Sequence, residues 1–163
     1  MDELTSLTYS LVLLSALATI LISLNFIKNQ KVYAYEYTIL ILVSTLSAML
    51  IASSYDLISM YLAIELQTLS FYVLAAFQRD SEFSTEAGLK YFVLGAVSSG
   101  LLLFGESIVY GSTGITNLEE LTKLLTLAHD GTTAVNPLTG VETGLLLMLV
   151  AFLFKISAVP FHM

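Results

Sequence analysis

Two residues of opposite charge, Glu65 and Lys155, stand within long apolar stretches of this chain. An isolated ionised group at bilayer depth costs several kcal/mol, so such residues usually pair, face a cavity or take part in ion movement. Opposite charges that meet lower each other's desolvation cost, and carboxylates and amines can both accept and release protons. The two residues therefore predict proton or cation translocation. The alternative is a buried ion pair that only fixes the register of helices.

The composition places the chain among polytopic helical membrane proteins, an all-α class. Its mean hydropathy is +0.85, and 12% of its residues are charged, against about 25% in soluble domains. The net charge of −7 makes nucleic acid an unfavourable partner. The chain has no cysteine, and its two histidines, His129 and His162, stand far apart. We therefore predict no metal site and no cofactor on this chain.

Apolar runs long enough to cross a bilayer predict about five transmembrane helices in a single membrane domain, 1–163. Both charged residues fall near the middle of their predicted spans. Pro160 follows Lys155 by five residues, and proline removes a backbone donor and clashes with the preceding turn. We expect the last span to be broken at Pro160, although a harmless kink is the alternative. The predicted spans are 7–27, 37–54, 57–77, 85–110 and 143–163.

The connection between the last two spans contains a predicted amphipathic helix, about 117–128. Its leucines recur at helical spacing, with acidic residues and Lys123 on other faces. Thr116 and Glu119 have the spacing of a capping box. We expect the helix either to lie at the membrane surface or to pack on a neighbouring subunit.

Two further charged residues belong to the fourth predicted span. Lys90 lies four residues after Glu86, which is the spacing of an ordinary surface pair, but it could also lie deeper and relay protons. Glu106 lies near the far end of the span, where we expect it to reach interfacial water. Small residues at 95 and 98–100 predict close helix packing.

Three blocks of the chain resemble, in family order, the chain 2 family of NADH:ubiquinone oxidoreductase, respiratory complex I. The first, 61–72, reads YLAIELQTLSFY and contains Glu65. The second, 84–92, reads STEAGLKYF and contains Lys90. The third, 154–162, reads FKISAVPFH and contains Lys155.

The resemblance implies part of an antiporter-like inverted-repeat fold that couples NADH:ubiquinone electron transfer to proton pumping. It implies that Glu65 and Lys155 form the charge pair of the proton path and that Lys90 is a further lysine of it. It implies an enzyme subunit without redox chemistry of its own, in the mitochondrial inner membrane or, alternatively, a bacterial plasma membrane. The partners implied are the other membrane-arm subunits and the lipid bilayer.

The resemblance covers only the N-terminal and central part of that family. We therefore expect either that a second polypeptide continues the fold after Met163 or that this sequence is a fragment of a longer chain. Two other functions remain open: a subunit of a related cation/proton antiporter or membrane-bound hydrogenase, and a structural membrane subunit with no proton path.

Overall fold

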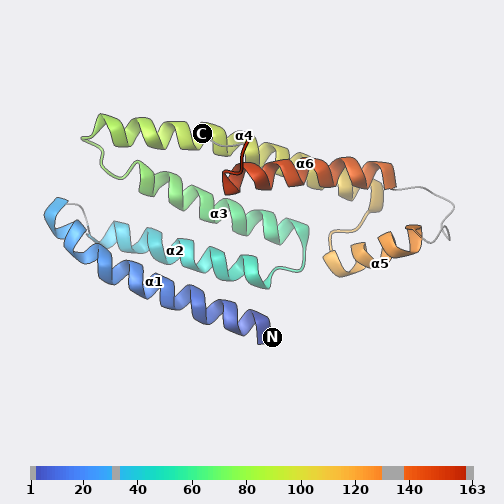
Figure 1. Cartoon of the computed structure of the whole chain (residues 1–163), viewed down its shortest axis with the longest axis horizontal. Helices are drawn as coiled ribbons and strands as arrows, with labels where there is room; N and C mark the ends of the chain where they lie inside the picture. The colour runs from blue at the N-terminus through green and yellow to red at the C-terminus, as the bar shows by residue number, and fades with distance from the viewer. Residues whose placement is uncertain (1–2, 31–33, 130–137, 161–163) are drawn as a thin grey trace. The chain divides into compact units, whose positions relative to one another are not determined.

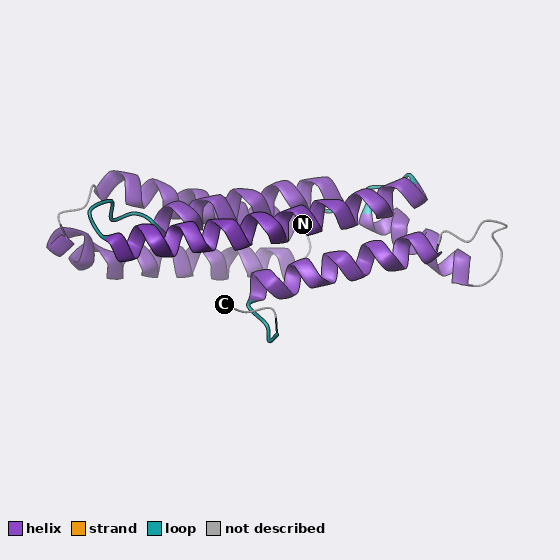
Figure 2. Ribbon diagram, turned by 90° about the horizontal axis from the view of Figure 1, so that it is seen from above, coloured by secondary structure: helices purple, strands orange, loops and turns teal. Residues whose placement is uncertain are grey.

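The computed structural model describes residues 3–30, 34–129 and 138–160, and every long element within these ranges is a helix (Figures 1 and 2). Four described stretches are long and apolar enough to cross a membrane. The predicted all-helical membrane architecture is confirmed. The helices are α1 (Glu3–Gln30), α2 (Ala34–Ser53), α3 (Leu57–Ala75), α4 (Glu82–Thr113), α5 (Leu118–His129) and α6 (Leu138–Ile156).

The long helices carry apolar side chains on their outer faces. Leu14, Ile22 and Phe83 are among the exposed examples, with 69%, 78% and 86% of their surface accessible. Lipid can cover such side chains, and a helix satisfies its own backbone polar groups without water. The outer faces of the molecule therefore fit a hydrocarbon environment.

The described chain forms two compact units, and the first comprises residues 1–54 and 62–93. In this unit α1 packs along α2, as Figure 1 shows. Tyr37 of α2 contacts Phe77 edge to face, with ring centroids 5.6 Å apart. The turn after α3 is closed by the Ser84 hydroxyl, which donates a 2.8 Å hydrogen bond to the Ala75 carbonyl.

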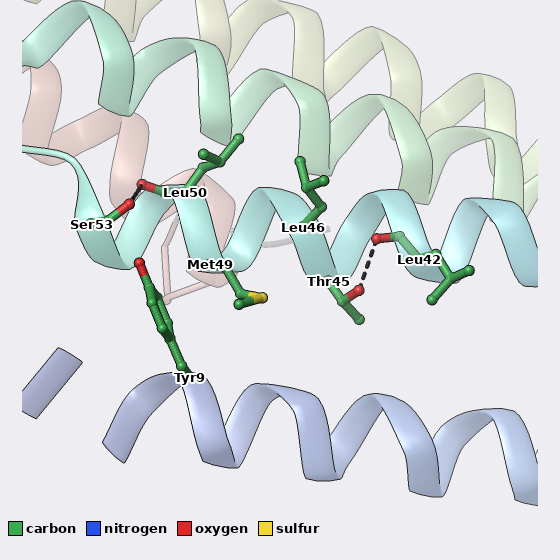
Figure 3. A pocket seen from close by; sticks show the side chains of 7 residues that line it. All are labelled: Tyr9, Leu42, Thr45, Leu46, Met49, Leu50 and Ser53. Carbon is green, nitrogen blue, oxygen red and sulfur yellow. Dashed lines mark hydrogen bonds between the residues drawn. The ribbon is translucent and has the colours of Figure 1, made fainter. Parts of the chain in front are cut away.

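The first unit also has an open, mainly apolar pocket of about 480 Å³ between α1 and α2. Figure 3 shows Tyr9 reaching toward α2 from α1, while the other lining residues come from α2. Two of these, Thr45 and Ser53, direct their hydroxyls to carbonyls of their own helix. The pocket therefore offers few free polar groups to a ligand.

The second unit comprises residues 55–61 and 94–163. Within it, the start of α3 pairs with the segment before α5 through an isolated antiparallel bridge between Asp56 and Asn117. The Leu57 amide donates to the Thr116 carbonyl and the Leu118 amide to the Tyr55 carbonyl, each at 2.9 Å. These bonds fix the beginning of α5 against the beginning of α3.

The predicted capping box of α5 is wrong, because the helix begins one residue later. Asn117 is the N-cap, and its side-chain oxygen accepts hydrogen bonds from the Glu119 amide at 2.9 Å and the Glu120 amide at 3.4 Å. Asparagine is among the strongest N-cap residues, while the Thr116 carbonyl is used in the bridge. Leu121 on the apolar face of α5 is 5% exposed.

Candidate functional site

In the second unit, α4 and α6 run antiparallel and touch backbone to backbone. A Cβ atom added to Gly144 would lie 2.7 Å from Cγ2 of Val109 and 2.8 Å from the carbonyl oxygen of Gly105. A Cβ on Gly140 would lie 2.9 Å from Cβ of Ser112. Small residues let membrane helices approach this closely. Close packing therefore occurs at glycines that the sequence reasoning did not name, whereas Gly100, one of the small residues that it did name, has open space beside it.

Lys155 stands on the same helix pair. Its Nζ donates a 3.2 Å hydrogen bond to Oγ of Ser99 on α4, and Ser99 is 6% exposed. Lys155 is the basic residue of the last turn of α6, where a positive charge is favoured by the negative end of the helix dipole. The chain thus places an amine beside a buried hydroxyl at the end of a helix.

The helix break next to Lys155 differs from the one predicted at Pro160. α6 ends at Ile156, and Ser157 adopts a left-handed conformation with φ of 57°. The Ser157 amide donates to the Phe154 carbonyl at 3.1 Å and the Ala158 amide to the Leu153 carbonyl at 3.0 Å. This is a Schellman motif, which closes a helix from within the chain.

The helix is therefore broken beside Lys155, which is the penultimate residue of α6. The helix begins at Leu138, earlier than the predicted start of the span at 143, and ends at Ile156, before Pro160. The carbonyls of Phe154 and Leu153 accept hydrogen bonds from the amides of Ser157 and Ala158. The position of Lys155 near the middle of a membrane span stays a prediction.

Glu106 is the charged residue that the sequence reasoning placed wrongly. It was expected at interfacial water, yet it is 6% exposed, and its Oε1 atom is buried without a hydrogen-bond partner among the described residues. It follows Gly105 directly, at the contact with α6. The spacing of Ser99, Leu102, Glu106 and Val109 on one helical face, all buried, is the sequence signal that could have located it.

Glu65 belongs to the first unit, on α3. It is partly buried and lies close enough to Tyr72, two turns along the helix, to interact with it electrostatically. Tyr72 is 7% exposed and packs edge to face on Tyr91 and Phe92 of α4, with ring centroids 4.8 and 5.6 Å away. Tyr72 thus links an aromatic cluster electrostatically to the carboxylate. Because Lys155 is in the other unit, the pairing of Glu65 with Lys155 stays a prediction.

Lys90 forms an ion pair with Glu86. Its Nζ lies 2.6 Å from Oε1 of Glu86, and the side chains are 60% and 59% exposed. The pair occupies the early turns of α4. This is the geometry of the surface-pair alternative, and a role of Lys90 in proton relay stays a prediction.

Comparison with known proteins identifies the family. Residues 54–163 match the model of the NADH:quinone oxidoreductase/Mrp antiporter transmembrane family. The chain belongs to this family. The resemblance drawn from the three sequence blocks is thereby confirmed, as is the antiporter-like fold.

Similar proteins come from plants, bacteria and archaea. The chain is 54% identical to NADH-ubiquinone oxidoreductase chain 2 of Marchantia polymorpha, over 99% of this chain and 33% of that protein. It is 44% identical to NADH-quinone oxidoreductase subunit N of Paramagnetospirillum magneticum, again over 99% of this chain and 33% of that protein. The chain spans about a third of the length of the curated relatives it matches.

A solved structure supports the same fold. The membrane-bound sulfane sulfur reductase, an archaeal respiratory membrane complex, contains a chain that is 27% identical. Its TM-score with this chain is 0.64, over 78% of this chain and 24% of that one. The helical arrangement is thus shared with a respiratory membrane complex.

Proposed function

We propose that this chain is part of a proton-translocating, antiporter-like membrane subunit of NADH:ubiquinone oxidoreductase. The observation that supports this most strongly is the chain's 54% identity, over nearly its whole length, to proteins named as chain 2 of that enzyme. The plant proteins are more similar than the bacterial ones at 44–46%, which favours the mitochondrial inner membrane over a bacterial plasma membrane. Its partners are the other membrane-arm subunits and lipid, and redox cofactors are carried elsewhere in the enzyme.

In this proposal Glu65 and Lys155 form the charge pair of the proton path. A carboxylate near a lysine stabilises the protonated amine, so a change of charge at Glu65 changes how strongly Lys155 holds its proton. The amine of Lys155 already has a hydrogen-bond partner, the Ser99 hydroxyl. This amine belongs to the last turn of α6, which ends at Ile156.

Lys90 is proposed as a further proton carrier of the same path. Its support is the block 84–92, which resembles the chain 2 family. Its pairing with the exposed Glu86 means that Lys90 would exchange protons near the start of α4 rather than at a buried site.

A second candidate is a subunit of a related cation/proton antiporter. The observation that favours it is the structural similarity to the archaeal sulfane sulfur reductase, which is a different respiratory complex. The two functions differ in the electron donor and acceptor of the parent complex. Co-purification of this chain with NADH:ubiquinone reductase activity supports the first, and its absence from that activity supports the second.

The test of the charge-pair proposal is the Glu65→Gln variant in the assembled complex. Proton pumping and NADH oxidation are measured together in sealed membrane vesicles, with Glu142→Gln as the control because Glu142 is exposed on α6. The expected result is a lower proton-to-electron ratio for Glu65→Gln, with assembly largely intact. Full pumping by this variant contradicts the charge-pair mechanism, whereas failure to assemble favours a purely structural subunit.

A further inference from the structure

Glu106 is a buried carboxyl that the proposed charge pair does not use. Its side chain is 6% exposed and its Oε1 atom has no hydrogen-bond partner among the described residues. On α4 it directly follows Gly105, whose carbonyl oxygen would lie 2.8 Å from a Cβ added to Gly144 of α6. The acid is thus buried next to a close contact of two helices.

An ionised carboxylate in such a place is unfavourable, because it loses its hydration without gaining a donor. Three remedies exist: a cationic partner, a bound metal ion, or a proton. The described residues offer no group of three His, Cys, Asp or Glu side chains that could hold a metal. A proton is the remedy that needs no further ligand.

Among the described residues, none forms an ion pair with Glu106. On α6, Gly144 and Met148 lie against Gly105, and the buried residues of this helix are apolar: Val141, Gly144, Met148 and Ala151. Farther along α6, Lys155 contacts Ser99, which is two turns from Glu106 on α4. The remaining charged side chains described in this unit are Asp56 at the start of α3, Glu119, Glu120 and Lys123 on α5, and the exposed Glu142 on α6.

We propose that Glu106 is a proton-binding residue of this chain, neutral at rest in the buried part of α4, which releases and rebinds a proton during turnover. The inference rests on the proposed function, because only a proton-translocating subunit would cycle this proton. The reaction is a proton transfer alone: the carboxylic acid becomes a carboxylate when the proton leaves and is restored when one returns.

In this proposal Glu106 and Lys155 influence each other through their charges and do not exchange protons directly. Glu106 lies seven positions after Ser99 on α4, which is about 10 Å along the helix. Direct transfer needs hydrogen-bond distance, so water or another group must carry the proton between them. A charge on either group still acts on the other, because a membrane interior screens charges weakly.

The experiment compares Glu106→Gln, Glu106→Leu and Glu106→Asp in the assembled complex. Proton-to-electron ratio and NADH oxidation rate are measured in sealed vesicles, and assembly is followed by native gel. Glu142→Gln is the matched control, an exposed carboxylate in the same unit. We expect Gln and Leu to lower the ratio at least twofold while assembly is retained, and Asp to restore much of it.

The possible results separate this inference from the proposed function. A full ratio with Glu106→Gln and Glu106→Leu overturns the inference, because the carboxyl is then dispensable. If Glu106→Gln does not assemble, Glu106→Leu decides, and failure of both overturns the inference in favour of a packing role. If Glu65→Gln also pumps fully, the proposed function fails; if only the Glu106 variants pump fully, the inference alone fails.

Discussion

Two glutamates of α4, one near its start and one toward its other end, have opposite surroundings. Near its start, Glu86 is 59% exposed and paired with Lys90. Near its other end, Glu106 is 6% exposed, and its Oε1 atom has no partner in the described chain. In an exposed ion pair, water can replace either partner at little cost. A buried carboxylate has no water, so it needs a partner within the protein or a proton. The contrast shows that burial, rather than residue type, decides which of these two carboxylates needs a partner.

The largest effect is expected from opening the α4–α6 contact. Gly144→Val would place a side chain against the Gly105 carbonyl and Val109, within 2.8 Å of both. Overpacking of this kind costs about 1–3 kcal/mol or more, and backbone cannot move away as a flexible side chain can. We expect a strong loss of assembled complex on native gels.

The control for this variant lies on α4, the other helix of the pair. Gly100→Ala adds a Cβ in open space, and alanine is favoured over glycine inside a helix by about 0.5–1 kcal/mol. We expect normal assembly. Equal losses for the two glycine variants would show that the contact does not hold these helices together.

The next effect concerns function rather than assembly. Lys155→Met keeps most of the aliphatic side chain but removes the amine that donates to Ser99. We expect a several-fold lower proton-to-electron ratio in vesicles. Lys123→Met, in which the lysine belongs to the exposed pair with Glu119, should leave the ratio unchanged. A similar loss of the proton-to-electron ratio in both variants would mean that the two lysines do not differ in their role in pumping.

A smaller effect is expected at the start of α5. Asn117→Ala removes the side-chain oxygen that accepts two amide hydrogen bonds, and loss of such a cap costs about 1 kcal/mol. We expect faster hydrogen exchange of the first α5 amides in the assembled complex. Thr116→Ala serves as control. A larger increase in hydrogen exchange for that variant would support Thr116, predicted from the sequence, as the N-cap.

The smallest effect is a pH dependence of α5. The hydrogen bond and charge of Lys123 Nζ, 2.7 Å away, hold the pKa of Glu119 below its usual 4.5. A carboxyl with a lowered pKa stabilises the folded state above its unfolded pKa, and this is lost as pH falls through the folded value. We expect hydrogen exchange of α5 to differ between wild type and Lys123→Gln at neutral pH and to converge below pH 4.5. If the difference in hydrogen exchange between the two proteins is the same at all pH values, ionisation of Glu119 does not stabilise α5.

The sequence predicts the helical spans well because hydropathy over about 20 residues is a strong signal. It predicts a helix break beside Lys155 but not its form, because the Schellman motif at Ser157 ends α6 before the proline that drew attention. It misplaces Glu106, because depth along α4 was inferred from the span boundaries. The exposure of the side chain depends instead on the packing of that part of α4, where Gly105 and Val109 contact α6.

The central claim is that Glu65 and Lys155 act as one charge pair in proton translocation. The most direct measurement is a double-variant cycle, in which the proton-to-electron ratio is determined for Glu65→Gln, Lys155→Met and the two combined. Residues that act as a unit give non-additive effects. The account predicts that the double variant is no worse than the poorer single variant. Losses that multiply would show that the two residues act independently and would contradict the claim.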